Sequence, residues 1–342
     1  MNSPKIPKYP CRCCIIPEVM VKMMKKEGYD VEMPNVQLDE SIRLRRQSMS
    51  FLARAMPATA GHADRDVFDS QNTASTRMKL IRTEGNIVSD DADINAVYEN
   101  GGIVRDYFKT VLDWNSIDNN GLDLVFNVHY LVKYNNAFWD GEQMTFGDGD
   151  GTNFKGFVHA LDVIAHELTH GVVQYTAALE YKGQSGALNE HYADAFGSAI
   201  KQWSLKQTAQ KADWLMGEVC LTGQFKGKAI RSMKSPADPA VVIMPQPETM
   251  AKIYKGTQDN GGVHINSGIL NKAFYLVSMD IGTQKAAVLW FETLKTLKST
   301  AKFTDFYKGL SKVSKTLITA GKIPNTTQKS LDTAFKTVGV IK

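Results

Sequence analysis

The chain has 342 residues, a formal net charge of +4, and a composition that is 43% hydrophobic and 22% charged. This length allows about two domains with a sizeable core, and the composition excludes wholesale disorder. Because no apolar run approaches the roughly 20 residues that span a bilayer, and no basic stripe with interleaved aromatic residues follows residue 50, we expect no contact with membrane or nucleic acid.

The first 50 residues are predicted to form a separate unit. Pro17 opens and Gly28 closes a helical pattern over residues 18–27, whose methionine-rich stripe we expect to pack rather than to bind a cofactor. Small and turn-prone residues then indicate a linker, placed at 51–64. The N-terminus lacks a long apolar stretch after its charges, so no signal peptide is indicated. Secretion by a non-Sec route and a cytoplasmic location both stay open.

Three of the four cysteines, Cys11, Cys13 and Cys14, are crowded together, and the fourth is Cys220. Neighbours this close cannot all pair with one another, so a disulfide framework is a poor interpretation. Reduced thiols in a reducing compartment are the simplest interpretation. The alternative is a thiolate that meets an active-site metal in a precursor.

The rest of the chain is predicted to form two lobes. Strand-like runs dominate residues 65–155, with the clearest alternation over 122–132. Helical periodicity follows over 158–176, 187–203, 263–280, 284–297 and 303–319, and near 326–337. We therefore predict an α+β fold with a β-rich N-terminal lobe (65–180), a helical C-terminal lobe (181–342) and a cleft between them.

The run His166-Glu167-Leu168-Thr169-His170 predicts a zinc-binding helix. Two histidines four residues apart project from one face of a helix, one turn apart, and can share one ion. Glu167 lies between them and can act as a general base without binding the metal. Two unrelated surface or core histidines are the alternative for this motif alone.

A third zinc ligand is expected from a second helix. Glu190 and Asp194 are four residues apart and share a face. We expect Glu190 to bind zinc and Asp194 to accept the far N–H of a ligand histidine, which fixes its tautomer. A solvated acidic face is the ordinary interpretation of such a pair, but the apolar residues around it indicate burial.

His264 follows a glycine turn at the start of another predicted helix. A single histidine is more often a satisfied core residue than a catalytic one. Asp259, five residues earlier, could hold this imidazole charged and oriented, so the two residues are candidates for catalysis.

These motifs resemble those of the thermolysin family of zinc metallopeptidases. Order and spacing agree over roughly residues 65–342, in the segments NNAFWDG at 135–141, GDGDG at 147–151, HELTH at 166–170, GALNEHYAD at 186–194, RSM at 231–233 and DNGGVHINSG at 259–268. The resemblance implies a two-lobed fold with the zinc helix at the base of the cleft. It also implies a neutral endopeptidase that cuts on the N-terminal side of hydrophobic residues.

The resemblance further implies a role for each matching side chain. The zinc ligands would be His166, His170 and Glu190. The catalytic groups would be Glu167 as base, Tyr181 and His264 as donors to the oxyanion, and Asp259 as the partner of His264. The substrate would be held by Arg231, by the strand-like segment Asn136 and Ala137, and by an apolar S1′ pocket of Phe154, Phe157, Val163 and Ile230.

One departure from the family pattern concerns calcium. The family's double calcium site maps onto Asp162, Lys201, Asp213, Leu215 and Glu218. Lys201 and Leu215 stand where the family has carboxylates. An ammonium cannot bind calcium, but it could supply the positive charge of one missing ion. We expect at most one calcium, held by Asp162, Asp213 and Glu218.

A second departure is the short N-terminal segment, which resembles the propeptide of the protealysin subgroup. Glu18 stands where that motif usually has a second proline. We hypothesise that residues 1–50 are an inhibitory propeptide that the enzyme removes itself. Cleavage at Ser50–Phe51 suits an apolar S1′ pocket, and Arg46 is the alternative for a trypsin-like activator. We expect protein and peptide substrates, the enzyme's own propeptide as a partner, and a monomer.

Three other functions agree with part of the pattern. A zinc aminopeptidase would need acidic groups to hold a free amine, and we find no such motif. A catalytically silent binding protein is opposed by the joint presence of Glu167, Tyr181 and His264. A purely structural zinc is opposed because three protein ligands leave the fourth position open.

Overall fold

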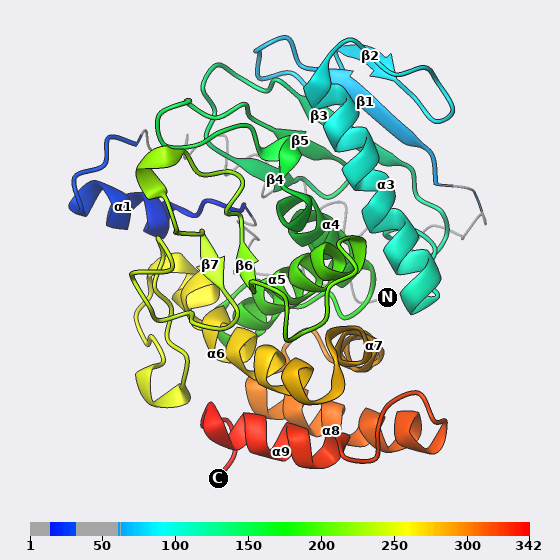
Figure 1. Cartoon of the computed structure of the whole chain (residues 1–342), viewed down its shortest axis with the longest axis vertical. Helices are drawn as coiled ribbons and strands as arrows, with labels where there is room; N and C mark the ends of the chain where they lie inside the picture. The colour runs from blue at the N-terminus through cyan, green and yellow to red at the C-terminus, as the bar shows by residue number, and fades with distance from the viewer. Residues whose placement is uncertain (1–13, 32–60, 62) are drawn as a thin grey trace, which may run out of the picture.

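The computed structural model of the chain describes residues 14–31, 61 and 63–342. Cys11, Cys13, Arg46 and the predicted cleavage bond Ser50–Phe51 lie outside the described residues, as does most of the predicted linker. A mixed sheet forms the N-terminal lobe and helices form the C-terminal lobe (Figure 1), which confirms the predicted α+β fold. Within the described residues, no helix is both long and apolar enough to cross a bilayer.

The sheet of the N-terminal lobe has five strands in the order β2-β1-β3-β5-β4. They are β1 (Arg65–Asp69), β2 (Lys79–Arg82), β3 (Leu124–Val128), β4 (Ala137–Trp139) and β5 (Met144–Phe146). β1, β3 and β5 run parallel, whereas β2 and β4 pair antiparallel at the two edges. Because β4 is an edge strand of this sheet, its outer side can accept one more extended chain.

The prediction that strands dominate residues 65–155 is wrong for α3 (Ala92–Leu112), a helix of 21 residues. Asp91 caps it by accepting from the backbone N–H groups of Asp93 at 2.8 Å and Ile94 at 3.3 Å. Two glycines in the middle of the helix hide its pattern, because glycine usually marks a break. Here glycine permits close packing: a Cβ at Gly101 would collide with the ring of Phe126 on β3.

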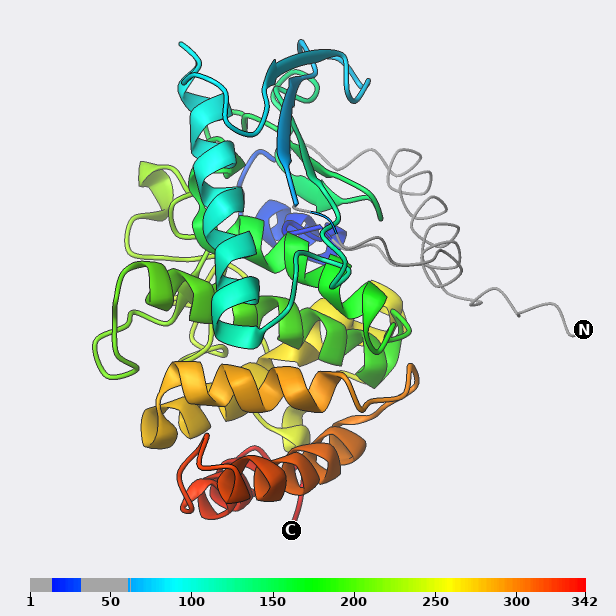
Figure 2. The same ribbon diagram turned by 90° about the vertical axis from the view of Figure 1, so that its right-hand side faces the viewer.

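The predicted helices of the second half are present, with ends shifted by a few residues. They are α4 (Leu161–Tyr175), α5 (Gly183–Ser204), α6 (Gln258–Ile281), α7 (Thr283–Leu294), α8 (Phe303–Thr319) and α9 (Thr327–Thr337). A small sheet of β6 (Leu215–Met216) and β7 (Arg231–Ser232) and short 3₁₀ helices at Phe157–His159, Gly223–Phe225 and Met250–Lys252 complete the described fold. The helices α7 to α9 lie at the end of the molecule opposite the sheet (Figures 1 and 2).

Helix α4 joins the two lobes. It packs against α3 and β4 on one side and against α5 on the other. Every residue from Asp162 to Val173 is buried, which is typical of a central helix without a solvent face. The two histidines of the motif are therefore held in a rigid, buried position.

The N-terminal segment 14–31 lies against both lobes. Its helix α1 (Glu18–Lys26) buries Met20, Val21 and Met24, so the methionine stripe is a packing face, as predicted. Beyond α1, the ring of Tyr29 lies 4.7 Å from that of Phe225. Asn153 Nδ2 donates to the carbonyl of Asp30 at 2.7 Å.

Candidate metal centre

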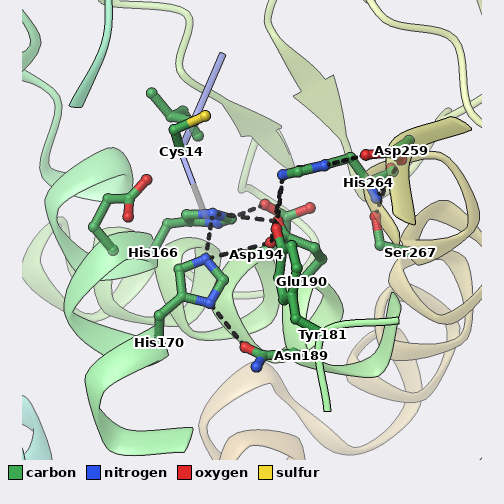
Figure 3. A network of polar contacts seen from close by, with 12 residues as sticks. Cys14, His166, His170, Tyr181, Asn189, Glu190, Asp194, Asp259, His264 and Ser267 are labelled. Carbon is green, nitrogen blue, oxygen red and sulfur yellow. Dashed lines mark hydrogen bonds and ion pairs between the residues drawn. The ribbon is translucent and has the colours of Figure 1, made fainter. Parts of the chain in front are cut away.

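The structure brings the three predicted zinc ligands together. His166 and His170 project from α4 toward Glu190 on α5, and the ligand atoms all lie within 4.8 Å of one another (Figure 3). The two Nε2 atoms are 3.1 Å apart. The Glu190 oxygens lie 3.6 Å from His166 Nε2 and 3.5 Å from His170 Nε2.

The second nitrogen of each imidazole has a fixed partner. His166 Nδ1 lies 2.9 Å from Asp194 Oδ1, and His170 Nδ1 lies 2.8 Å from Asn189 Oδ1. Both partners accept hydrogen bonds, so each Nδ1 donates, and in the neutral imidazoles the two Nε2 lone pairs face each other. Two lone pairs beside a carboxylate repel unless a cation lies between them, so this donor set fits zinc.

Asn189 belongs to the metal centre although its role does not emerge from the sequence. Its position directly before Glu190 is the only local signal. Its amide oxygen accepts from His170 Nδ1, as Asp194 accepts from His166 Nδ1. The spacing of the acidic pair predicts such a role for Asp194 only.

Asp194 is buried with a charged partner. Arg231 donates from Nη2 to Oδ1 at 2.8 Å and from Nε to Oδ2 at 3.0 Å, and Asn271 Nδ2 donates to Oδ2 at 2.8 Å. Burial alone would raise the pKa of Asp194, but the positive charge of Arg231 and the hydrogen bond of His166 outweigh it and lower the pKa well below its usual range. The carboxylate therefore stays ionised and can orient His166.

Glu167 is buried between the zinc helix and the edge strand. Its Oε2 accepts from the backbone N–H of Trp139 on β4 at 3.2 Å. The carboxylate thus lies beside His166 on α4 and contacts the strand that the sequence predicts to pair with substrate.

Tyr181 and His264 face the metal centre from the opposite side. The Tyr181 hydroxyl lies 2.9 Å from His264 Nε2 and donates to Glu190 Oε1. Burial, reinforced by the charge of Glu190, raises the pKa of Tyr181 well above its usual value, so the hydroxyl keeps its proton. Burial would lower the pKa of His264, but Glu190 and Asp259 outweigh it and raise the pKa.

The turn before His264 explains the sequence Asp-Asn-Gly-Gly. Residues 259–262 all have left-handed φ angles, between 51° and 85°. Glycine adopts this region without strain, and aspartate and asparagine tolerate it better than other residues. The turn lets one carboxylate do two things: Asp259 Oδ2 caps the helix by accepting from the backbone of His264 and Ile265, and Oδ1 lies 2.6 Å from His264 Nδ1.

The two residues predicted to pair with a substrate backbone are in contact with the N-terminal segment. Asn136 accepts from the N–H of Ile16 and donates to its carbonyl, both at 3.1 Å. The N–H of Ile15 donates to the carbonyl of Ala137 at 3.4 Å. Residues 15 and 16 thus run along β4 as an added extended chain.

Arg231, predicted to hold a substrate carbonyl, also contacts this segment. Its Nη1 donates to the carbonyl of Ile15 at 3.2 Å, and Cys14 forms an antiparallel bridge with Phe138. The chain segment 14–16 therefore contacts the groups of both lobes that the sequence predicts to bind a substrate backbone.

The residues predicted to line an S1′ pocket are fully buried and belong to the same apolar cluster as Ile15 and Ile16. They are Phe154, Phe157, Val163 and Ile230. The rings of Phe154 and Phe157 are stacked with centroids 5.9 Å apart.

At the expected calcium site the structure shows an ammonium among the acidic groups. Lys201 Nζ lies 3.5 Å from Asp162 Oδ2, 3.1 Å from Asp213 Oδ2 and 3.2 Å from the carbonyl of Leu215. Burial would lower the pKa of Lys201, but Asp162, Asp213 and Glu218 raise it, so the amine is charged. Two of the three expected calcium ligands are therefore shared with an internal cation.

A second group of ionisable side chains does not emerge from the sequence. His129 lies between two carboxylates, with Nδ1 3.0 Å from Asp148 and Nε2 3.0 Å from Asp91. The hydrogen bond to Asp148, reinforced by Asp91 and opposed by burial, raises the pKa of His129 to about 9. Both ring nitrogens are therefore protonated donors at neutral pH.

Known proteins are similar to this chain in sequence and in fold. The thermolysin metallopeptidase catalytic domain matches residues 37–174, and the alpha-helical domain of the same family matches residues 177–340. An extracellular metalloprotease of Pectobacterium carotovorum subsp. carotovorum is 40% identical over 306 residues, covering 86% of this chain and 88% of that protein. Protease PrtS of Photorhabdus sp. (strain Az29) is 43% identical over 255 residues, covering 71% of this chain and 69% of that protein.

A solved structure, the precursor of protealysin, a metalloproteinase from Serratia proteamaculans, is similar over almost the whole chain. It has 37% sequence identity and a TM-score of 0.81, and the match covers 96% of this chain and 100% of that one. Both the sequence motifs and the two-lobed architecture are thus accounted for. The chain belongs to the thermolysin family of metallopeptidases.

Proposed function

We propose that this metallopeptidase is a zinc endopeptidase that cuts on the N-terminal side of hydrophobic residues and is made as a precursor. One observation carries the proposal: the Nε2 atoms of His166 and His170 converge on Glu190 in a buried site, while each Nδ1 is held by its own acceptor. Glu167 follows His166 on α4 and contacts Trp139 of β4. Tyr181 and His264 lie close to Glu190 (Figure 3).

The residues around the metal centre suit peptide hydrolysis. A bound zinc ion would supply Lewis acidity toward water and toward the peptide carbonyl. Glu167 would take a proton from the attacking water and deliver it to the nitrogen of the leaving amine. Tyr181 and His264 would donate hydrogen bonds to the oxygen on which negative charge develops.

The protonation states support these roles. The raised pKa of Tyr181 keeps its hydroxyl a donor. Asp259 fixes His264 Nδ1 and leaves Nε2 facing the centre. Donors that are oriented before the reaction need no rearrangement when the charge appears, which is why such groups accelerate acyl transfer.

The N-terminal segment supports the proposed mode of substrate binding. Residues 14–16 lie antiparallel to β4, with their backbone groups held by Asn136, Ala137 and Arg231. An extended peptide substrate would add to the same edge by the same main-chain bonds. An apolar S1′ pocket would favour a hydrophobic side chain after the cleaved bond, because that side chain gains from burial.

The same contacts support an inhibitory propeptide. Substrate cannot use Asn136 and Arg231 while Ile15 and Ile16 occupy them. We propose that residues 1–50 block the enzyme until they are removed, by self-cleavage at Ser50–Phe51 or by an activator at Arg46. The mature enzyme would act as a monomer.

The test is Glu167→Gln, with surface Glu292→Gln as the matched control. The active-site variant should keep its fold and bind zinc but lose casein hydrolysis, because the glutamine amide cannot accept the proton of the attacking water. The control should match the parent enzyme, and a chelator should abolish the activity of both. Retained hydrolysis in Glu167→Gln would refute the proposed base.

Maturation is tested in the same proteins by N-terminal sequencing. The parent and Glu292→Gln should begin at Phe51, whereas purified Glu167→Gln should remain full length. If the inactive variant matures alone at the same bond, self-processing is wrong.

A further inference from the structure

The three zinc ligands leave one coordination position without a protein donor. A zinc ion held by three side chains keeps its fourth tetrahedral position open. His166 Nε2 and His170 Nε2 converge on Glu190, whose Oε2 is buried and makes no hydrogen bond within the described ranges. This oxygen lies 3.6 Å from His166 Nε2, so it faces the place of the cation.

The backbone around Cys14 is fixed beside this centre. Cys14 forms its bridge with β4, and the next residue of that strand, Trp139, donates its N–H to Glu167 at 3.2 Å. Arg231 holds the carbonyl of Ile15 at 3.2 Å from the other side. The backbone at Cys14 and Ile15 is thus held by both lobes. Phe138, the residue that pairs with Cys14, directly precedes Trp139, whose N–H contacts the proposed base Glu167.

The Cys14 side chain lies near the metal centre, outside the group of three ligand atoms that are within 4.8 Å of one another. Figure 3 shows it above His166, and its thiol donates to the carbonyl of Ile16 at 3.5 Å. Cys220, the other described cysteine, is fully buried in the apolar core, where burial raises the pKa of its thiol.

We propose that the Cys14 thiolate is the fourth zinc ligand of the precursor, a role that rests on the zinc site and propeptide proposed above. Thiolate sulfur is a preferred zinc donor, with a Zn–S distance of about 2.3 Å. The S–H proton is released to solvent as the sulfur lone pair forms the bond to zinc, and no electron is transferred. The bound sulfur excludes water from the position that hydrolysis needs. Removal of the propeptide removes the sulfur.

The test uses the full-length Glu167→Gln precursor, which cannot process itself, with cobalt(II) in place of zinc. A cobalt–thiolate bond gives an intense near-ultraviolet absorption band that nitrogen and oxygen ligands do not give. We expect this band in the precursor and its loss in the Cys14→Ser derivative. Cys220→Ser, Cys11→Ser and Cys13→Ser derivatives should keep it. Metal analysis of each protein should show one cobalt per chain.

A second measurement does not depend on the folding of a cysteine variant. The same precursor is alkylated with its metal bound and again after chelation, and the modified cysteines are located by peptide mass mapping. Cys14 should be protected by the metal and labelled after chelation. Cys220 should behave alike in both states, because burial alone protects it.

Several outcomes would overturn the inference. They are the absence of the band in the precursor, its persistence in Cys14→Ser, its loss in Cys11→Ser or Cys13→Ser alone, and equal labelling of Cys14 with and without metal. These experiments distinguish failure of the proposed function from failure of the proposed role of Cys14. A processed enzyme that cannot hydrolyse casein would refute the function whatever the band shows. An active enzyme whose precursor lacks the band would refute only the role of Cys14.

Discussion

At the scale of single residues, Arg231 connects the N-terminal segment to the candidate metal centre. Its guanidinium holds Asp194, which orients His166, and the same group donates to a backbone carbonyl of the N-terminal segment. Arg231 and Asp194 are both buried, so removing either one leaves an unpaired buried charge. Such a loss costs about 3–5 kcal/mol in other proteins. Substitutions at these positions therefore change stability and metal geometry together.

Tyr181 allows a sharper test of catalysis, because only its hydroxyl need be removed. Tyr181→Phe should lower kcat by about 10²–10³, the effect of deleting one oxyanion donor elsewhere, with a smaller change in KM. Steady-state kinetics on a peptide substrate measure both constants. Tyr307→Phe, which loses a hydroxyl bonded to Asp332 far from the centre, should keep both. A kcat for Tyr181→Phe equal to that of the control would contradict the oxyanion role.

At the scale of elements, Lys201 ties the end of α5 to the start of α4 through Asp162 and to the following loop through Asp213. Lys201→Met should destabilise the fold by roughly 1–3 kcal/mol, between the values for surface and buried ion pairs, because two carboxylates lose their cation. Thermal unfolding measures the loss.

Calcium should restore part of the stability of Lys201→Met, because the carboxylates and the carbonyl of Leu215 remain as oxygen ligands. Lys272→Met is the control, because the Lys272 ammonium donates to the carbonyl of Lys234 at 2.7 Å and pairs at 3.9 Å with the single carboxylate of Glu248. This variant should gain no stability from calcium. If calcium stabilises Lys272→Met as much as Lys201→Met, the ammonium does not stand in for an ion.

His129 joins the cap of α3 to the turn after β5 through Asp91 and Asp148. Its folded pKa of about 9 lies above the ordinary value of 6.5, so folding favours the protonated form. Its stabilising contribution is therefore complete below pH 6.5 and is lost as the pH rises through about 9.

The test compares urea midpoints of the inactive Glu167→Gln protein with and without His129→Gln across this pH range. The difference between the two proteins should shrink as the pH rises. His159→Gln, whose partner Asp93 is near the same helix cap, serves as the control and should leave the pH dependence of His129 intact. A difference that is constant with pH would show that His129 is not charged in the folded protein.

At the scale of the whole molecule, the N-terminal segment contacts both lobes through Asn136 and Arg231. Ile15 and Ile16 are almost fully buried, and burying one such side chain contributes about 1.5–3 kcal/mol. A synthetic peptide of residues 14–31 should therefore inhibit the mature enzyme competitively. An Ile15→Asp peptide should inhibit at least about tenfold less well, as expected from that energy. Inhibition constants measure the effect.

The matched control peptide carries Lys22→Ala. The Lys22 side chain is 55% exposed and, among the described residues, forms its ion pair with Glu18 on its own helix. This peptide should therefore inhibit as the parent does. Equal inhibition by all three peptides would show that the segment does not bind as the structure has it.

The sequence by itself determined the family, the α+β fold, the zinc helix and the role of Asp194 as the partner of a ligand histidine, which the structure identifies as His166. The zinc helix and the acidic pair depend on spacings of four residues within a helix, which place two side chains on one face whatever surrounds them. The local sequence pattern gave a wrong prediction for α3, where tertiary packing explains the two glycines. The glycines of α3 indicate a break in sequence, but in the fold they allow the helix to approach Phe126.

Only the tertiary structure decided which groups complete the site. Asn189 as the partner of His170, the ammonium of Lys201 between two carboxylates, and Cys14 beside the metal centre all depend on contacts between different segments of the chain. The hydrogen bond that holds the chain next to Cys14 joins Arg231 to Ile15, which is 216 residues away in the sequence. Helix and strand periods fix only the direction of a side chain relative to its own element, whereas the neighbours it meets are set by how the elements pack.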